Sequence, residues 1–381
     1  MDASFTLEQP KLPPPEHPLK KKFFITIVIL ILAAFIIANV IVFFPELVPI
    51  SLQLKQEPIQ KQYQPPQQQP STQPNQTPLL PSHQDKKVYT GQGTKIYVIN
   101  ELSNDVWYIN LDEENVIKKI PVGKKPTYGY WDSEGLYVSN TNDNTISIID
   151  TYKNEVKKTM SVGETPLGIA AIKDEIYVAG ENDNIIKVVN KETYEEEDIF
   201  FLKNPRQMVL NTKKDRLYVT NADSNELSIV NPFIRNIAKN IVVGTTPESI
   251  AVSDDESLAI VTNKDSNDIS FIPLKLGKES RRIHVGINPV HVTFVPPENQ
   301  IALIALKDEH KVAVLSLNTF EVIKKIDVET PTYIAMIGDR AYIASHTKNK
   351  IYILDTQRLK IIGDIPTGLG PFSIVVKENS N

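Results

Sequence analysis

Residues 216-RLYVTNADSNELSIVN-231 read as two short apolar strands joined by a polar turn, and the same arrangement occurs elsewhere in the chain. Two further copies are 135-GLYVSNTNDNTISIID-150 and 175-EIYVAGENDNIIKVVN-190. Valine, isoleucine and tyrosine favour strands, and asparagine and aspartate tolerate the left-handed backbone of tight turns. The sequence therefore repeats a β-hairpin, and the length of the repeat decides the fold.

A proline that begins an apolar strand recurs at intervals of 39 to 42 residues. The seven positions are Pro126, Pro166, Pro205, Pro247, Pro289, Pro331 and Pro371. Each interval holds four strand-like segments; in residues 216–252 these are LYVT, ELSIV, a segment that ends in NIVV, and ESIAV. Four strands in a period near 40 residues predict an all-β fold, a seven-bladed β-propeller of four-stranded antiparallel blades.

The order of strands also predicts how the ring closes. Residues 95–100 match the second strand of a blade, and residues 371–376 match the first. We therefore expect the C-terminal strand to complete the N-terminal blade, which would remove an open sheet edge. Residues 86–91 either add a further strand or simply lead into the ring.

A glycine stands three residues before most of the recurring prolines. It is expected to supply positive φ in a tight turn between blades. The five glycines are Gly123, Gly163, Gly244, Gly286 and Gly368, whereas Leu202 and Val328 stand at this offset in the other two junctions.

The N-terminal quarter of the chain has a different character. Residues 23–44 are 22 nearly unbroken apolar positions, enough for a helix of about 33 Å that crosses a bilayer core of about 30 Å. Lysines 20–22 precede this run, and the next basic residue is Lys55, so the N-terminus is expected in the cytoplasm. The alternative is a cleaved signal peptide; the length of the run favours an uncleaved signal-anchor, a single transmembrane helix.

Glutamine and proline dominate the segment that follows. This segment has too few apolar residues to form a folded core, which favours an extended stalk. A docking site for a proline-binding partner is the less favoured alternative. The predicted organisation is a cytoplasmic tail (1–22), a transmembrane helix that contacts the lipid bilayer (23–44), a stalk (45–85) and a propeller (86–381). The propeller would lie outside the cytoplasm, at the cell surface or in a periplasm.

Composition excludes several classes of site. The chain has no cysteine, so disulfides, thiolate metal sites and a cysteine nucleophile are ruled out. A formal net charge of −5 gives no bulk attraction to nucleic acid, and no nucleic-acid partner is expected. No glycine-rich phosphate loop, Gly-x-Ser-x-Gly elbow or zinc-protease motif is present, and we predict no cofactor and no catalytic residue.

The hairpin motifs resemble the YVTN family of β-propeller repeats. The resemblance rests on 137-YVSN-140, 218-YVTN-221, the weaker 260-IVTN-263, the aspartates Asp150 and Asp355, and the Val-Gly-x-x-Pro junctions. It covers about residues 90–379 and implies surface-layer-like and periplasmic binding proteins, with more distant kin among quinoprotein dehydrogenases, the propeller of nitrous-oxide reductase, and lactonases. Repeats 3, 6 and 7 depart, with Gly180, Leu306 and Ser345 in place of the asparagine.

A ligand site would be built from residues that the repeat leaves free. Strand alternation places the turns between second and third strands on the same face as the Gly-x-x-Pro junctions, at one mouth of the central channel. The candidate ligand-binding residues there lie at the starts of inner strands: Tyr128, Arg206, Glu248, His291 and Tyr333.

Three weaker patterns have simpler interpretations. His291, His310 and His346 could gather for a metal, but no ligand spacing links them, and we predict no metal site. The turns at 140–144, 221–225 and 263–267 resemble calcium loops without the glycine and glutamate that an EF-hand needs. The acidic run at 195–198 is interpreted as a solvated edge.

Two functions remain open. The favoured hypothesis is a membrane-anchored, extracytoplasmic interaction module without enzymatic activity, which binds protein or glycan on one face. The alternative is a propeller enzyme, a lactonase-like hydrolase or a cofactor-assisted oxidoreductase, with its site at the channel mouth. Fold does not decide between them.

Overall fold

The computed structural model describes residues 94–297 and 300–377, which belong to the second of two compact units of the chain. The predicted tail, transmembrane helix and stalk, and residues 86–91, lie outside the described residues. Within the described ranges, no helix is long and apolar enough to span a bilayer.

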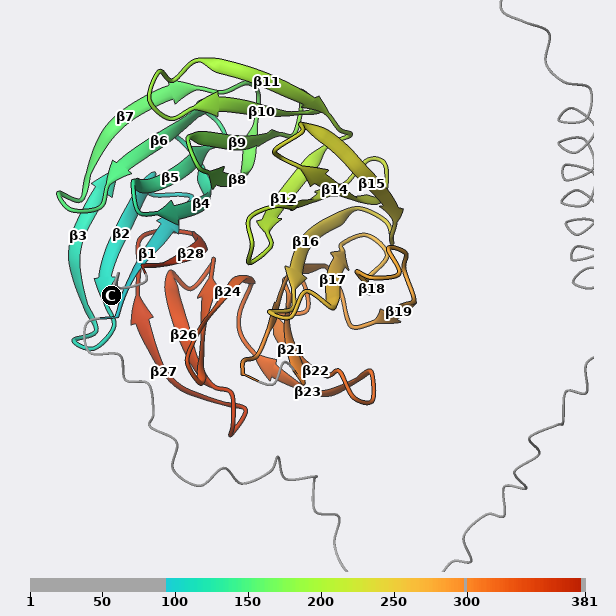
Figure 1. The fold of residues 1–381 in the computed structure, drawn as a ribbon. Helices are drawn as coiled ribbons and strands as arrows, with labels where there is room; N and C mark the ends of the chain where they lie inside the picture. The colour runs from blue at the N-terminus through green and yellow to red at the C-terminus, as the bar shows by residue number, and fades with distance from the viewer. Residues whose placement is uncertain (1–93, 298–299, 378–381) are drawn as a thin grey trace, which may run out of the picture. The chain divides into compact units, whose positions relative to one another are not determined.

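The described residues form a ring of seven sheets, each of four antiparallel strands (Figure 1). The predicted propeller is thus confirmed. We number the sheets as blades 1 to 7 in chain order. From the inner strand outward, the blades consist of β28 (Pro371–Lys377), β1 (Lys95–Asn100), β2 (Asp105–Asn110) and β3 (Asn115–Pro121); β4 (Pro126–Asp132), β5 (Gly135–Asn140), β6 (Thr145–Asp150) and β7 (Glu155–Ser161); β8 (Pro166–Ile172), β9 (Glu175–Gly180), β10 (Ile185–Asn190) and β11 (Glu196–Phe201); β12 (Pro205–Leu210), β13 (Leu217–Asn221), β14 (Glu226–Asn231) and β15 (Asn236–Val242); β16 (Pro247–Val252), β17 (Leu258–Asn263), β18 (Asp268–Pro273) and β19 (Arg281–His284); β20 (Pro289–Phe294), β21 (Ile301–Leu306), β22 (Lys311–Ser316) and β23 (Glu321–Asp327); and β24 (Pro331–Ile337), β25 (Arg340–Ser345), β26 (Lys350–Asp355) and β27 (Lys360–Pro366).

The ring closes through blade 1, as the sequence predicts. The C-terminal strand β28 pairs with β1, and Lys95 lies opposite Lys377 while Asn100 lies opposite Pro371. Antiparallel pairing therefore brings the two ends of the described chain to the same edge of the ring.

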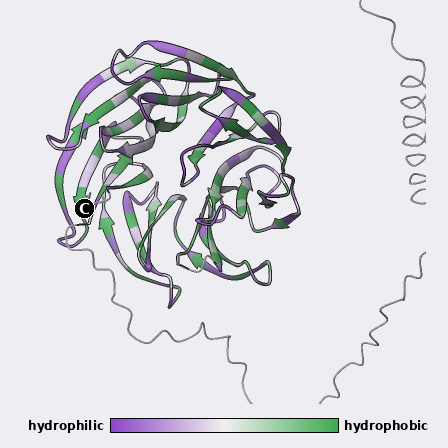
Figure 2. Cartoon of the chain, in the orientation of Figure 1, coloured by the Kyte–Doolittle hydropathy of each residue, from purple (hydrophilic) through white to green (hydrophobic). Residues whose placement is uncertain are grey.

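Burial falls from the middle of each blade to its rim. Second strands such as β5 and β21 are buried along their whole length, whereas outer strands such as β3 alternate exposed and half-buried residues. Figure 2 shows the same alternation of apolar and polar residues along the outer strands. The apolar clusters span neighbouring blades: Tyr177 and Val188 of blade 3, for example, pack with Leu217 and Val219 of blade 4. The core is therefore a set of layers between blades, and no blade buries its apolar surface alone.

One face of the ring carries both the turns between second and third strands and the junctions between blades, and we call it the junction face. In every blade, the first residue of the turn donates its backbone N–H to the carbonyl of the residue before the recurring proline. The seven donors are Glu101, Thr141, Glu181, Ala222, Lys264, Lys307 and His346. These bonds confirm that turns and junctions share a face.

Asparagine at the end of each turn completes this contact. In six blades its side-chain oxygen accepts the backbone N–H of the residue before the proline, at 2.8 to 3.0 Å. In blade 6, His310 takes the asparagine position, and the Thr330 N–H donates to its Nδ1 at 3.1 Å. The calcium-like turns at 140–144, 221–225 and 263–267 thus have a structural explanation, and so does His310.

The junction glycines act in a way that the sequence predicts only in part. Gly163 and Gly286 do adopt positive φ, but Gly123, Gly244 and Gly368 do not. At these three positions a Cβ would lie within 2.7 Å of the asparagine that ends the second strand, so the glycine is required for space. Leu202 and Val328 occupy the place of the valine before the glycine, because their junctions are one residue shorter.

Replacing Gly244 tests this close packing. A Cβ at Gly244 would lie 2.5 Å from Cγ and Nδ2 of Asn263, which is fully buried and donates to Asp268 and Ser270. We expect Gly244→Ala to lower the free energy of unfolding by about 1–3 kcal/mol. Urea unfolding of the full-length protein in detergent, followed by tryptophan fluorescence, measures the change, because both tryptophans of the chain lie in the propeller.

The matched control is Gly363→Ala, since the nearest atom to a Cβ at that position is 3.7 Å away, on Ile353. We expect no loss of stability there. Equal losses in the two variants would contradict the packing explanation.

Candidate functional site

The inner strands share an irregularity that shapes the centre of the ring. In all seven blades the register between the first and second strands shifts directly after the recurring proline. A bulge of this kind re-aims side chains and breaks the simple alternation of a strand. The bulge lets either the first or the second residue after the proline face the channel, depending on the blade, while residues such as Gln207 and Ser249 bond to the next blade instead. The five predicted candidates occupy these positions on β4, β12, β16, β20 and β24.

Arg206 forms the ionic centre of this group. Its guanidinium lies 2.8 Å from Glu181 Oε1 and 3.8 Å from Glu248 Oε2, and all three side chains are at most 20% exposed. Glu181 is the first turn residue of blade 3, and the sequence did not single it out. The signal that could have found it is its position, because the equivalent residue in every blade bonds to the residue before the recurring proline of its own blade.

Glu248 is a buried carboxylate whose negative charge is only partly compensated by neighbouring positive charges. Burial raises its pKa, whereas the positive charges of Arg206 and Lys264 lower it in part. Its Oε2 atom has no hydrogen-bond partner among the described residues. Burial also raises the pKa of Tyr128 well above its usual value, and the negative charge of Glu248 adds to that effect. The negative charge of Glu248 thus acts on the Tyr128 phenol.

His291 and Tyr333 form an aromatic pair on adjacent inner strands. Their ring centroids lie 3.9 Å apart with the planes tilted by 41°. Burial lowers the pKa of His291 to about 3 and raises that of Tyr333 to about 12, so both side chains are neutral at physiological pH. A second aromatic contact, edge to face at 5.4 Å, joins Tyr128 to Phe372. The five predicted residues thus lie near the junction-face ends of five inner strands, where Arg206 contacts Glu248, His291 packs on Tyr333, and Tyr128 packs on Phe372.

The buried imidazole of His291 should make the fold sensitive to acid. Because its folded-state pKa lies below that of the unfolded chain, its contribution to stability is complete above about pH 6.5 and is lost as the pH falls toward 3. We expect wild type to lose about 2 kcal/mol more than His291→Gln between pH 7 and pH 5. Urea titrations at the two pH values measure this difference.

His284→Gln is the control for this prediction, because His284 is exposed on the outer strand β19. It should retain the pH dependence of wild type. If His291→Gln retains it as well, another group is responsible.

The three histidines considered for a metal do not come together. His310 serves a turn, and Nε2 of His346 lies 2.6 Å from Glu101 Oε2, while His291 packs on Tyr333. Among the residues that the structure describes, no group of three or more histidine, aspartate or glutamate side chains is placed to hold a metal ion.

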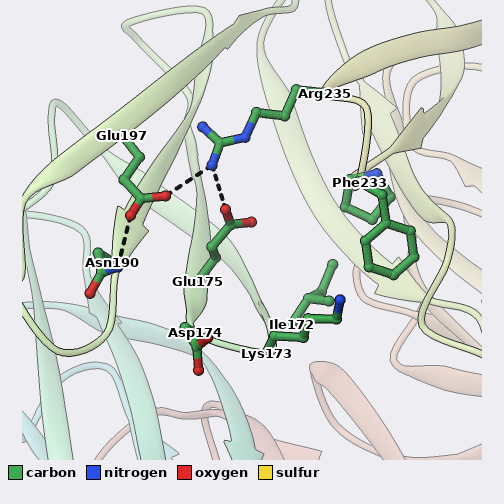
Figure 3. Close-up of a pocket in the computed structure, with 9 residues that line it drawn as sticks. Ile172, Lys173, Asp174, Glu175, Asn190, Glu197, Phe233 and Arg235 are labelled. Atoms are coloured by element: carbon green, nitrogen blue, oxygen red, sulfur yellow. Dashed lines mark hydrogen bonds and ion pairs between the residues drawn. The ribbon is translucent and has the colours of Figure 1, made fainter.

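Two pockets lie apart from the five candidate residues. One of about 300 Å³ lies on the junction face beside blades 1 and 2, and Glu101, Leu102 and Lys125 line it. The other, of about 310 Å³, lies on the opposite face, between blades 3 and 4 (Figure 3). There Arg235 bridges Glu175 and Glu197 at 2.5 and 2.9 Å.

The second pocket explains much of the acidic run at 195–198. Glu197 is paired with Arg235, and Glu196 lies 2.7 Å from Nζ of Lys187. The interpretation as a simple solvated edge was therefore incomplete, since these carboxylates join the edge strand to its neighbours. Sequence reasoning missed Arg235 because Glu175 and Arg235 are 60 residues apart.

Comparison with known proteins agrees with this architecture. The family model described as YNCE-like beta-propeller matches residues 87–374. A search of curated proteins finds no match. Among solved structures, hydrazine synthase from Kuenenia stuttgartiensis is 17% identical with a TM-score of 0.54, covering 65% of this chain and 93% of that chain.

Two further structures have a TM-score of 0.64. A protein of unknown function from Desulfotomaculum acetoxidans is 10% identical and covers 74% of this chain and 98% of that chain. A candidate 6-phosphogluconolactonase from Bacteroides fragilis is 12% identical and covers 77% of this chain and 100% of that chain. At these identities the similarity concerns the fold alone.

Proposed function

We propose, from the premise that this chain belongs to the YNCE-like beta-propeller family, that it is a membrane-anchored interaction module that binds protein or glycan outside the cytoplasm. Residues 23–44 would anchor it as a single-pass protein, and residues 45–85 would act as the stalk. The binding site in this proposal is the channel mouth on the junction face.

The observation that carries the proposal is the gathering of non-repeating side chains at that mouth. The repeat fixes the proline, the asparagine and the apolar strands, yet the two positions after the proline vary among most blades, and only blades 2 and 7 share a pair, Thr-Tyr. There Arg206, Glu248 and Tyr128 supply charge and aromatic surface, and His291 and Tyr333 extend that surface. Ligand sites are typically concave, mostly apolar and equipped with a few placed polar groups.

Site-specific photo-crosslinking tests the binding role and the face that carries it. A photoreactive phenylalanine derivative would replace Leu102, which is 59% exposed on the junction face. The control position is Ile234, 67% exposed in the β14–β15 turn on the opposite face. In intact cells, the junction-face probe should capture a partner that the control probe does not. Equal capture from both faces, or none, would count against the proposal.

The proposed topology needs a separate test. Protease added outside intact cells, after permeabilisation of an outer membrane where one exists, should cut within residues 55–85 and release the propeller. Protection of the full-length chain under these conditions would refute the extracytoplasmic location.

A second candidate function is a hydrolase of the lactonase type. It draws support from Glu248, a buried carboxyl with a raised pKa beside a phenol, since perturbed groups of this kind cluster at catalytic sites. Purified full-length protein would be assayed against a panel of sugar lactones, with Glu248→Gln as the matched variant. Turnover that is lost in the variant would favour the enzyme, and equal background rates would exclude this site.

A further inference from the structure

We propose that the ligand of the channel mouth is an acidic saccharide, a chain of sugar rings that carry carboxylates. This inference rests on the proposed binding function and narrows it. Three features of the mouth carry it: two unpaired cations, buried polar atoms without partners, and neighbouring aromatic rings.

The unpaired cations are Lys264 and Lys307, the first turn residues of blades 5 and 6. Both are half-buried, and their charges reach Glu248, since each lowers the pKa that burial raises there. Among the described residues, no carboxylate oxygen lies within 4.0 Å of either ammonium group.

At the same turn position the acidic residues are already paired. Glu181 holds Arg206, and Glu101 holds His346 at 2.6 Å and Lys125 at 3.5 Å. At the first turn position, the charges that remain without an ion-pair partner are therefore those of Lys264 and Lys307, although the whole chain carries a formal net charge of −5. This local excess favours an anionic ligand over a neutral or cationic one.

The polar atoms without partners require both donors and acceptors. Arg206 Nε–H is a buried donor, Glu248 Oε2 is a buried acceptor, and His291 Nδ1 is buried on a side chain only 5% exposed. None of the three has a hydrogen-bond partner among the described residues. A hydroxyl group both donates and accepts, so a polyhydroxylated ring can satisfy all three where a simple anion cannot.

The aromatic side chains complete the match. The pairs Tyr128–Phe372 and His291–Tyr333 place four rings on inner strands at the same mouth. Tyr128 and His291 are buried beneath their partners, whereas Phe372 and Tyr333 are half-buried and can offer apolar faces to the C–H surface of a sugar and, in Tyr333, a polar tip for its hydroxyls. Carboxylates on the sugar would then reach Lys264 and Lys307.

Binding of matched oligosaccharides to the full-length protein in detergent tests the inference. Tetragalacturonate and maltotetraose are both α-1,4-linked tetrasaccharides, and only the first carries carboxylates. By calorimetry in about 0.1 M salt, where exposed charges are screened beyond roughly 10 Å, we expect tetragalacturonate to bind at least about tenfold more tightly. The double variant Lys264→Ala/Lys307→Ala should abolish that preference.

The control double variant, Lys213→Ala/Lys275→Ala, removes two exposed lysines from turns on the opposite face and should retain the preference. Equal binding of the two saccharides, no binding of tetragalacturonate, or a preference that survives in Lys264→Ala/Lys307→Ala would overturn the inference. So would a tetraglutamate peptide that binds as tightly as tetragalacturonate. If Leu102 photo-crosslinking still captures a partner in any of these cases, the binding function stands and only the saccharide assignment fails.

Discussion

Truncation of the chain after Gly370 is expected to abolish the cooperative unfolding transition of the propeller. The deletion removes β28, the inner strand of blade 1, and leaves β1 as an unpaired edge beside β2. Ile374, only 2% exposed, leaves the core with it, and the partly buried Val375 and Val376 lose their packing; full burial of one apolar side chain is worth about 1.5–3 kcal/mol. Together with the lost β1–β28 pairing, this is a large share of the total stability of a typical domain, about 5–15 kcal/mol.

The measurement is urea unfolding followed by tryptophan fluorescence, with size-exclusion chromatography to detect association through the exposed edge. Truncation after Lys377 is the control, since it keeps all of β28 and should unfold like wild type. Ile374→Asp offers an intermediate case, because it places a charge at a side chain only 2% exposed. A normal transition after removal of residues 371–381 would show that closure is dispensable.

Replacing Arg206 should give the largest effect of any single substitution at the channel mouth. Arg206→Ala leaves Glu181 and Glu248 without their cation in a site that solvent reaches poorly. Breaking a buried ion pair by removing one partner costs about 3–5 kcal/mol. We expect Arg206→Ala to fall near the lower end, since each of the three side chains keeps at least a tenth of its surface exposed.

Glu248→Gln should act in the opposite direction. Because burial raises the folded-state pKa of Glu248, its favourable contribution is complete below the unfolded-state pKa and is lost as the pH rises through the raised value. Neutral glutamine avoids that loss, so we expect the variant to be more stable than wild type at pH 7 and equal to it at pH 4 in urea unfolding at the two pH values.

The double variant Arg206→Ala/Glu248→Gln then completes a thermodynamic cycle. Its stability should exceed that of Arg206→Ala alone, because the unpaired buried carboxylate is gone. Additive effects of the two substitutions would mean that Arg206 and Glu248 are not coupled.

The fold could be predicted from sequence because the repeat occurs seven times in the chain. A hairpin such as 216–231 alone would specify only two strands, whereas the regular return of proline specifies both the number of blades and the strand that closes them. The function of the junction glycines was harder to predict. Positive φ and lack of space both favour glycine in a sequence. At Gly244, only the distance from an added Cβ to the Asn263 side chain shows that lack of space is the reason.

The candidate site could be predicted in position but not in chemistry. Residues that follow the proline belong to inner strands, so Arg206 and Glu248 had to face the centre. The pairing of Arg206 with Glu181 depends on the contact between one blade and the next, which no periodicity encodes. The ion pairs in the Arg235 pocket could not be predicted for the same reason, because Arg235 of blade 4 meets Glu175 of blade 3 across a blade boundary.

The pairing of β1 with β28 also fixes how the ring is presented. Strand β1 runs from Lys95 toward Glu101, and Glu101 belongs to the junction face. Within the described residues, the chain therefore enters the ring on the face opposite the junction face, so the N-terminal end of β1 and the channel mouth lie on opposite sides of the ring.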